Sequence, residues 1–443
     1  MNILRTILFL CLFSLFFNCI AQNNELKKYN RIPIALVPAS FPVNFALMSS
    51  GNFQFVAFYD TAHRMVIAKR KLNKKKWDYQ SLDSKIPWDT HNYLSLALDK
   101  NGIIHLSGNM HSSPLIYFRS SKPFDIHSMQ KVDKMTGKEE DITTYPEFIT
   151  NSAGDLIFHY RYGRSGSGYE VYKKWDVGKA EWKRLLDKPL TDGEGKMNAY
   201  MQGPLSGPDG NYHLLWVWRD SPDCATNHTL SYARSKDLLN WESIDGKKLN
   251  LPITIESTET YVDTTQIYGG LINIGIKIGF DQSGKTLPGY LKYDSIGNTQ
   301  LFAARFENGN WKSYQLSNWN YRWDFKGMGS IRHEIEIEPI RPAKNKNELI
   351  FAYHHIKYGD GQVVVDNSTL KPLRTEKFMA TYPSAIDSLQ MKYPGVQVNK
   401  AFDKGKPAND KKYLLRWETL PPNRDQLPEN TDIEPALLEL IEY

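Results

Sequence analysis

The feature that most limits the possible folds of this chain is a strand–turn–strand pattern that recurs along its length. Each copy consists of an apolar strand, a turn containing Gly or Asn, and a second apolar strand rich in aromatic residues. The copies read FALMSSGNFQFVAFYD, LSLALDKNGIIHLSG, EFITNSAGDLIFHYRYG, GPLSGPDGNYHLLWVWR, IKIGFDQSGKTLPGYLKYD and EPIRPAKNKNELIFAYHH. Successive turns lie roughly 50 to 75 residues apart, which is the spacing of four-stranded propeller blades with long loops.

Tryptophans follow several of these copies, each after a further strand and a polar turn. They are Trp77, Trp182, Trp241 and Trp311. A single four-stranded sheet of this kind cannot bury both of its faces, so neighbouring sheets must stack around an axis, with these tryptophans wedged between them. The pattern therefore predicts an all-β fold, and specifically a β-propeller.

The number of blades follows from the count of copies and from the chain ends. Six copies are visible directly, and we expect the chain ends to form a seventh four-stranded blade, with a closing strand near Trp417. Helical periodicity is nearly absent except around Pro435 to Glu442, where it predicts a short helix. A pair of stacked β-sandwiches is the alternative fold, but it does not explain so regular a period.

The first 21 residues are typical of an export signal. A single Arg precedes a short apolar run that ends in Cys-Ile-Ala, so we expect a bacterial secretory signal peptide cleaved after Ala21. Cys19 leaves a less favoured lipoprotein alternative. No later segment is apolar over a length that would span a bilayer. We therefore predict a secreted or periplasmic protein whose residues 22–443 form one propeller domain.

Cysteine content and charge restrict the partners of the mature chain. Cys224 would be its single thiol, so no internal disulfide can form and the stability must come from a hydrophobic core, for which about 420 residues suffice. The formal net charge of +6 is compatible with an acidic polymer as partner without requiring one. We expect a monomer that binds neither nucleic acid nor a membrane.

Two histidines bracket one predicted hairpin. His91 and His111 stand at the two ends of THNYLSLALDKNGIIHLSGNMHSSPL, in which a turn from Asp99 to Gly102 separates two alternating apolar runs. A hairpin returns its ends to the same sheet edge, so the imidazoles should lie side by side. One histidine at a strand end is more often an ordinary hydrogen-bonded residue, but a pair of titratable rings favours a site.

The inner strands of the next two copies add polar groups at corresponding places. Tyr145 stands just before a strand in TTYPEFI, where Pro146 favours an extended backbone, and Arg161 lies on the returning strand. Tyr200 and Arg219 occupy the equivalent places in the following copy. Inner-strand ends of several blades meet at one mouth of a propeller channel, so we expect these side chains to converge there.

The segment after Arg161 contains a glycine-rich loop from Gly163 to Gly168. No helix pattern follows this loop, so a phosphate-binding role is disfavoured and a turn at the channel mouth is the better interpretation. Arg164 in this loop is a candidate for binding an anionic ligand.

Two His, two Tyr and Arg without an acid pair exclude some chemistries and favour one. Glycoside hydrolysis by the usual route needs two carboxylates, and serine hydrolase chemistry needs a nucleophile elbow. A cation that neutralises a uronate carboxylate makes the weakly acidic proton on C5 removable, and Tyr or His can then take that proton and protonate the leaving oxygen. This reaction is the β-elimination of polysaccharide lyases.

A second cluster lies in WVWRDSPDCATNHTLSYARS. Cys224 and His228 are four residues apart, and His213 stands on the preceding strand. A thiolate with nearby imidazoles is a candidate structural zinc site, although a buried inert thiol is a common alternative.

Several of these segments resemble one protein family. HNYLSLALDKNGIIHLSGNMHSSPLIYFRS, TYPEFI, HYRYGRSGSG, WVWRDSPDCATNH and LPPNRD are similar to segments of seven-bladed propellers of the BNR-4 type. That type includes the ulvan lyases of polysaccharide lyase families twenty-four and twenty-five and enzymes that cleave L-rhamnosyl-α-1,4-glucuronate. The resemblance extends from about Pro33 to Asp425, and the two-histidine segment is its most specific part.

The resemblance implies roles for residues of this chain. His91 and His111 would line the active-site channel, Tyr145 would be the catalytic tyrosine, and Arg161 would neutralise the carboxylate. It also implies that Asn92 and Tyr200 bind substrate and that Cys224 and His228 hold a structural zinc, with His213 as a third ligand. Arg164 and Arg219 are substrate-binding candidates from their positions in the sequence. The resemblance leaves open how Tyr and His divide the roles of base and acid.

The function expected from sequence is therefore an exported lyase that cleaves the rhamnose-(1→4)-uronic acid linkages of ulvan. Its substrate would be an anionic, sulfated, uronic-acid polysaccharide. The alternatives are a rhamnosyl-glucuronate lyase acting on arabinogalactan side chains and a carbohydrate-binding propeller without catalysis. A hydrolase is less favoured, because a sialidase would need an arginine triad that the sequence does not offer.

Overall fold

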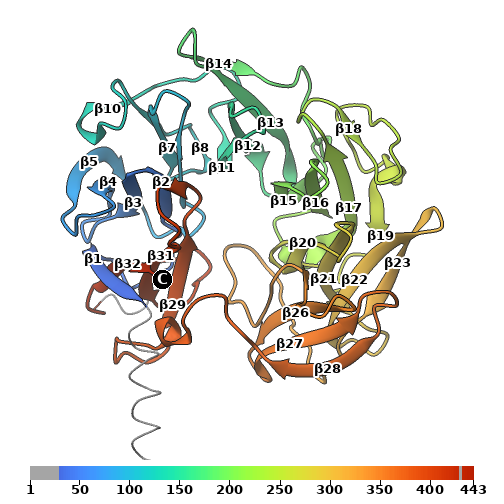
Figure 1. The fold of residues 1–443 in the computed structure, drawn as a ribbon. Coiled ribbons are helices and arrows are strands. Elements are labelled where there is room, and N and C mark those ends of the chain that lie inside the picture. The colour runs from blue at the N-terminus through green and yellow to red at the C-terminus, as the bar shows by residue number, and fades with distance from the viewer. Residues whose placement is uncertain (1–28, 429–431) are drawn as a thin grey trace, which may run out of the picture.

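The computed structural model describes residues 29–428 and 432–443, so the predicted signal peptide lies outside the described residues. Within them the strands form seven separate sheets, which are arranged in a ring around a central space (Figure 1). The predicted all-β propeller is therefore confirmed. No helix among the described residues combines the length and the apolar character that crossing a membrane requires.

Four sheets cover the first part of the ring and are numbered here in chain order. Sheet 1 contains β2 (Ala46–Gly51), β3 (Phe53–Tyr59), β4 (Arg64–Lys71), β5 (Asp78–Lys85) and β30 (Lys406–Pro407). Sheet 2 contains β6 (Leu94–Leu98), β7 (Ile104–Gly108), β9 (Tyr117–Ser120) and β10 (Met129–Lys131). Sheet 3 contains β8 (His111–Ser113), β11 (Thr143–Thr150), β12 (Leu156–Arg164), β13 (Ser167–Asp176) and β14 (Glu181–Arg184). Sheet 4 contains β15 (Asn198–Ser206), β16 (Tyr212–Arg219), β17 (Asn227–Ser235), β18 (Trp241–Glu242) and β19 (Tyr261–Asp263).

Three further sheets complete the ring. Sheet 5 contains β20 (Ile276–Phe280), β21 (Thr286–Tyr293), β22 (Thr299–Glu307) and β23 (Asn310–Gln315). Sheet 6 contains β24 (Ile335–Ile337), β25 (Arg341–Pro342), β26 (Glu348–His355), β27 (Gly359–Asp366) and β28 (Pro372–Lys377). Sheet 7 contains β29 (Gln397–Phe402), β31 (Tyr413–Thr419), β32 (Ala436–Glu442) and β1 (Asn30–Val37). Short 3₁₀ helices lie between strands: η1 (Ile126–Ser128), η2 (Cys224–Thr226), η3 (Thr258–Thr260), η4 (Asn273–Gly275) and η5 (Ser384–Asp387).

Aspartate side chains hold several turns of the recurring pattern, of which the turn at Asp99 is an example. The Asp99 carboxylate accepts hydrogen bonds from the backbone N–H groups of Asn101 and Ile103, each at 2.9 Å, and Gly102 takes the left-handed backbone that the turn needs, with φ +77°. An Asp side chain that bonds its own turn in this way stabilises the loop locally. This explains why so short a sequence signal predicted the hairpins correctly.

Two of the four predicted tryptophans, Trp182 and Trp311, contact a neighbouring sheet, as predicted. Trp182 of sheet 3 is 5% exposed, and its indole N–H donates to the hydroxyl of Tyr117 in sheet 2 at 3.1 Å. Trp311 of sheet 5 contacts the ring of Tyr232 in sheet 4, with 5.7 Å between ring centroids. Burying these large rings between sheets contributes much of the free energy that holds the stack together.

The chain ends meet in sheet 7. Strand β32 lies between β1 and β31, and Trp417 of β31 is fully buried, which confirms the expected closing strand. The helix predicted around Pro435 to Glu442 is wrong, because residues 436–442 form β32. Hydrogen bonding to a strand on each side outweighs the helical preference of its Leu and Glu residues, and Glu439 forms an ion pair with Arg31 at 3.2 Å.

Candidate active site

His91 and His111 lie side by side, as the hairpin predicted. Strands β6 and β7 pair from Leu94 with Gly108 onward, and His111 then starts β8, which crosses to β11 of sheet 3. The two imidazole rings stack with centroids 4.2 Å apart and planes 28° apart. A histidine pair therefore lies at the junction of sheets 2 and 3.

One carboxylate, Asp89, joins both rings. Its Oδ1 accepts from the backbone N–H of His91 at 2.8 Å and lies 2.9 Å from Nδ1 of the same residue, and its Oδ2 lies 2.5 Å from Nδ1 of His111. Burial alone would raise the pKa of Asp89, but the hydrogen bonds from His111 and His91 hold this pKa well below its usual range. Both Nε2 atoms consequently remain without a partner among the described residues. Sequence analysis missed Asp89, which stands two residues before His91.

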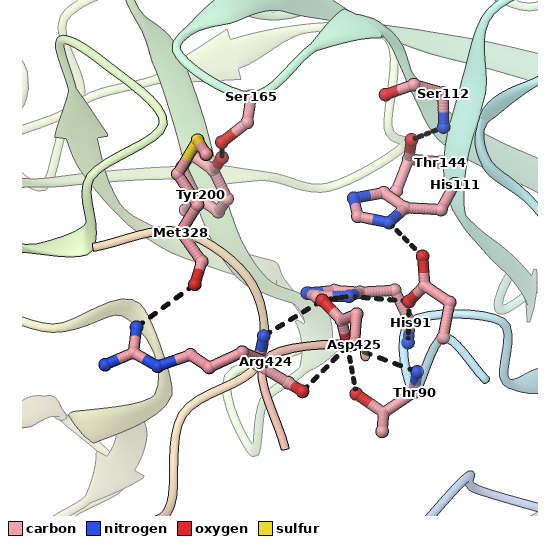
Figure 2. A network of polar contacts seen from close by, with 12 residues as sticks. Thr90, His91, His111, Ser112, Thr144, Ser165, Tyr200, Met328, Arg424 and Asp425 are labelled. Carbon is pink, nitrogen blue, oxygen red and sulfur yellow. Dashed lines mark hydrogen bonds and ion pairs between the residues drawn. The ribbon is translucent and has the colours of Figure 1, made fainter. Parts of the chain in front are cut away.

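A second carboxylate reaches His91 from the far end of the chain. Asp425 Oδ2 lies 3.0 Å from His91 Nδ1, and Oδ1 accepts from the Thr90 and Ser330 hydroxyls at 2.9 and 2.7 Å. Figure 2 shows Asp425 beside His91 and Thr90, with Arg424 extending away from the histidines toward the Met328 carbonyl. Burial opposes the charge, yet the His91 hydrogen bond and charge lower the pKa of Asp425 to about 2.

The sequence also did not predict Asp425 as a site residue, although its segment LPPNRD was part of the family resemblance. No local pattern marks the residue, because its partners are more than 90 positions away in the sequence. Its backbone takes a left-handed conformation, with φ +58°, and the preceding Arg424 has φ +53°. Such conformations are costly for non-glycine residues and indicate that the surrounding contacts hold this segment firmly.

Tyr145 lies between His91 and Tyr200 in a column of aromatic rings that contact arginine side chains. Its ring lies 6.0 Å from that of His91 and 6.2 Å from that of Tyr200. The Arg161 guanidinium lies 5.0 Å above the Tyr145 ring, and that of Arg219 lies 3.8 Å above the Tyr200 ring. The predicted convergence of His, Tyr and Arg side chains from sheets 2, 3 and 4 is thus present.

The backbone at Tyr145 differs from the expected extended form. Tyr145 lies inside β11 rather than before it, with φ +60°, at a break in the pairing register between Thr144 and Glu147. The break is a β-bulge, which redirects a side chain and costs conformational energy in a non-glycine residue. Pro146 therefore does not impose an extended backbone here. Tyr200 likewise lies inside β15.

Arg161 is fully buried without a carboxylate partner among the described residues. Its guanidinium donates to the hydroxyls of Thr144 and Tyr200 at 3.0 and 3.4 Å, while Nε has no hydrogen bond. Arg219, 8% exposed, donates to the side-chain oxygens of Asn227 and Asn273 at 2.8 and 2.7 Å, again without an ion pair within the described ranges. Buried charges normally have a charged partner, so these two cations are candidates for binding an anionic ligand.

Tyr200 experiences this positive charge. Burial would raise its pKa, but the charges of Arg219 and Arg161 and a hydrogen bond with Ser165 lower the pKa below the usual value of 10. The hydroxyl lies 2.6 Å from Ser165 Oγ, in the glycine-rich loop (Figure 2). That loop therefore serves the site, as predicted, but through Ser165, which sequence analysis missed.

Two predicted substrate-binding residues are not joined to this column. Asn92 is buried next to His91, its backbone carbonyl accepts from the Tyr59 hydroxyl at 2.7 Å, and its Oδ1 has no partner among the described residues. Arg164 is exposed at the end of β12. Roles for both residues in binding stay predictions.

The site opens into a cavity of about 1090 Å³. Its wall includes Thr90, His91, Tyr145 and Arg219, and it continues between sheets 6 and 7 past His354 and Lys400. This volume exceeds the range of about 300–1,000 Å³ that is usual for sites of small ligands. The cavity is therefore large enough for several units of a polymer.

The predicted zinc ligands do not converge. His213 Nδ1 lies 2.6 Å from the Tyr232 hydroxyl and Nε2 lies 2.9 Å from Asp209 Oδ1. His228 pairs with Trp218, which stands five positions from His213 along β16, so the two histidines are about 16 Å apart along the strand. His213 as a third ligand is therefore wrong, because the register places it at the opposite end of sheet 4.

The other two proposed ligands have different partners. Both nitrogens of His228 are engaged, Nε2 with Asp220 at 2.8 Å and Nδ1 with the Thr229 hydroxyl at 3.0 Å. Cys224 is buried in a hydrophobic cluster, and burial raises the pKa of its thiol. A zinc site built on these three residues does not fit the structure.

Within the described ranges, the side chains whose spacing would suit a metal ion are those of the histidine site. Ligand atoms of Asp89, His91, His111 and Asp425 all lie within 4.8 Å of one another. The short N–O distances given above already pair these atoms by hydrogen bonds.

Metal analysis of the purified protein tests both locations. We expect Cys224→Ser to leave the zinc content unchanged, because no group of three or more potential ligands among the described residues includes that sulfur, and to leave the melting temperature nearly unchanged. The metal content of a matched Asp89→Asn protein shows whether the histidine group binds a metal ion. Loss of stoichiometric zinc in Cys224→Ser alone would restore the original prediction.

Comparisons with known proteins agree with this fold. Residues 53–319 match the BNR repeat-containing family called BNR_4. The chain is 21% identical over 326 residues to an ulvan lyase (PL25) from Pseudoalteromonas sp. (strain PLSV), with 64% of each chain aligned. It is 26% identical over 133 residues to the short isoform of an ulvan lyase from Alteromonas sp. (strain LOR), covering 27% of this chain and 25% of that protein. The chain thus spans less than two thirds of either curated relative.

Solved structures extend the likeness to nearly the whole chain. The polysaccharide lyase Uly1 superposes with a TM-score of 0.64 at 15% identity, covering 93% of this chain and 98% of Uly1. A PL25 ulvan lyase, solved also with -[GlcA(1-4)Rha3S]- bound, superposes with a TM-score of 0.57 at 13% identity, covering 92% and 95%. At such identities the likeness establishes the shared fold. Since the family match covers more than half of the sequence, this chain belongs to the BNR repeat-containing family.

Proposed function

We propose that this protein is a polysaccharide lyase that cleaves ulvan at the linkage between rhamnose and uronic acid by β-elimination. The observation that carries the proposal is the pair of buried guanidinium groups without carboxylate partners among the described residues. Arg161 lies against the Tyr145 ring and Arg219 against the Tyr200 ring. A uronate carboxylate would supply the missing negative charge. The ulvan lyases among the similar proteins support this choice of substrate.

The reaction needs three functions, and the site has groups for each. A cation must neutralise the carboxylate on C5, which stabilises the negative charge that develops when the C5 proton leaves. A base takes that proton, and the electron pair of the broken C5–H bond is held as an enolate-like charge on the carboxylate. This pair forms the C4–C5 double bond as the C4–O bond breaks, and an acid protonates the leaving oxygen. Each product pair is thus one unsaturated uronyl end and one free rhamnose end.

Tyr145 and the histidines are the candidates for moving protons. The Tyr145 hydroxyl has no hydrogen-bond partner within the described ranges, and both histidines turn Nδ1 to Asp89 and keep Nε2 available. A group that exchanges protons with substrate must be free of competing partners and within reach of the reacting atoms. Arg161 and Arg219 remain charged throughout and bind the carboxylate.

The substrate test is absorbance near 235 nm, because β-elimination creates a conjugated double bond. We expect absorbance and reducing ends to rise together when the protein meets ulvan, and product masses to show unsaturated uronyl ends. Cleavage of arabinogalactan but not ulvan would assign the rhamnosyl-glucuronate activity instead. Binding without any rise, at every pH tested, would leave a carbohydrate-binding propeller and refute the lyase.

Export is part of the same proposal. A polymer the size of ulvan is degraded outside the cytoplasm, which agrees with the predicted signal peptide at residues 1–21. We expect a mature N-terminus at Gln22 and a single-chain mass in solution. Mass spectrometry of the exported protein and light scattering check both, and a lipid-modified N-terminus at Cys19 would support the lipoprotein alternative.

A further inference from the structure

Arg219 is held by two amide oxygens that come from neighbouring sheets. Its Nε donates to Oδ1 of Asn227 at 2.8 Å, and its Nη2 donates to Oδ1 of Asn273 at 2.7 Å. Asn227 pairs with Arg219 in the β16–β17 register of sheet 4, whereas Asn273 begins η4, just before β20 of sheet 5. Sheets 4 and 5 are neighbours in the ring (Figure 1). The guanidinium group is therefore fixed across the junction of these two sheets.

These contacts leave part of the guanidinium group available to a ligand. A guanidinium has five N–H groups, of which the two asparagines accept from one on Nε and one on Nη2. The Tyr200 ring covers one face of the group, with 3.8 Å between the guanidinium carbon and the ring centroid. No described residue accepts a hydrogen bond from Nη1, and Arg219 and Asn273 both lie in the wall of the large cavity. The remaining N–H groups can therefore bind an anion in this cavity.

The two acceptors satisfy N–H groups of Arg219 without cancelling its charge. An amide oxygen is neutral, whereas a carboxylate in the same place would form an ion pair with the guanidinium. Asp220, the next residue in the chain, is paired with His228 Nε2 at 2.8 Å instead. Burial would raise the pKa of Tyr200, but the charges of Arg219 and Arg161 lower it. The described residues therefore leave the positive charge of Arg219 uncompensated.

A neutral acceptor beside an arginine is not by itself a sign of function. Arg70 in sheet 1 donates from Nε to Oε1 of Gln54 at 2.8 Å, and both side chains are buried, but neither belongs to the wall of the cavity. Arg219 differs because it combines neutral acceptors with N–H groups at the cavity. Arg70 and Gln54 therefore provide a comparison outside the site.

We propose that Asn227 and Asn273 are positioning residues for Arg219, whose neutral amide oxygens orient the guanidinium and keep its full positive charge for the carboxylate of the bound uronic acid. This inference rests on the proposed function, because the anion is the uronate of that substrate. A carboxylate at position 227 or 273 would compete with the substrate for the same cation. Neutral side chains at both positions are thus a requirement for binding the anion.

The test compares two substitutions that a purely structural role would rank in the opposite order. Asn273→Asp keeps the shape of the side chain and its acceptor oxygen but adds a negative charge, whereas Asn273→Ala removes the acceptor and adds no charge. We expect kcat/KM on ulvan to fall by about 10²-fold or more in Asn273→Asp and by about tenfold or less in Asn273→Ala. Equilibrium binding of ulvan should weaken in the same order.

Asn227→Asp repeats the test from the other side of the guanidinium. This side chain is fully buried, so the variant also reports on stability. We expect the melting temperature to be retained or raised, because the new carboxylate pairs with Arg219, while the affinity for ulvan falls. Damage to the fold would lower both quantities together. Asn273 is only half-buried, so its two variants decide the matter if Asn227→Asp does not fold.

Gln54→Glu is the matched control, because it places the same charge beside the buried Arg70 outside the cavity. We expect it to leave kcat/KM and ulvan binding unchanged. If Asn273→Asp binds ulvan and turns it over as well as Asn273→Ala or better, the amides are only structural, and the inference is overturned even where the lyase is confirmed. A wild-type protein that binds ulvan without cleaving it would refute the lyase, and the order of the affinities would still decide this inference.

Discussion

Tyr145→Phe is expected to lower turnover on ulvan by at least about 10²-fold while the affinity for the polymer stays nearly unchanged. The substitution removes one hydroxyl that no described residue holds and keeps the ring between His91 and Tyr200. Loss of a general acid–base group costs about 10²–10⁴ in rate, and a hundredfold loss corresponds to about 2.7 kcal/mol in the activation barrier. Initial rates at 235 nm and equilibrium binding of ulvan measure the two effects separately.

Tyr79→Phe provides a matched control for this experiment. Its hydroxyl donates from sheet 1 to the Ile34 carbonyl in β1 of sheet 7 at 2.7 Å, away from the site, so its loss should leave turnover unchanged. Phe can adopt the same backbone conformation as Tyr at position 145. The melting temperature of Tyr145→Phe should therefore match that of the wild type. Retained turnover in Tyr145→Phe would transfer proton abstraction to the histidines.

Arg161→Ala is expected to reduce kcat/KM on ulvan by about 10³-fold or more and to weaken binding as well. The guanidinium is fully buried and has hydroxyl groups as its only partners within the described ranges, so a bound carboxylate would be its sole anionic partner. Neutralisation of a charge that grows in the transition state contributes several kcal/mol, and a thousandfold loss corresponds to about 4 kcal/mol. Steady-state kinetics and ulvan binding check both parts.

Loss of a buried side chain also destabilises the fold, so a control must separate the two causes. Arg70 is another buried arginine, 3% exposed, which donates to Gln54 and to the Lys74 carbonyl in sheet 1. Arg70→Ala should lower the melting temperature and leave kcat/KM unchanged. Arg161→Lys retains the charge without the planar fork and should recover part of the activity. Full activity in Arg161→Ala would leave Arg219 as the group that neutralises the carboxylate.

The sequence was most informative where the signal is local. Alternating apolar residues and turn residues such as Asp99 to Gly102 predicted the strands and hairpins, because a turn of this kind is closed by its own aspartate within four residues. The hairpin between His91 and His111 predicted that these rings are neighbours, and they stack. Inner-strand positions likewise predicted that Tyr145 and Arg161 meet.

The sequence was least informative where the partners are remote. The zinc prediction rested on the short spacing of Cys224, His228 and His213, but a strand places alternate residues on opposite faces and remote positions at opposite ends. The helix predicted for residues 436–442 failed for a related reason, since pairing with β1 and β31 outweighs local preference.

The residue pattern of this chain alone is sufficient to specify an all-β propeller and to identify tyrosine, arginine and histidine side chains that lie together in the structure. Only the tertiary structure identified Asp89 and Asp425 as partners of these histidines. Asp89 lies in a loop without a recognisable sequence pattern, and Asp425 lies in the C-terminal segment, far from the histidines in the sequence. Periodicity is a property of neighbouring residues, whereas the electrostatic environment of a side chain is a sum over everything that folding brings near it.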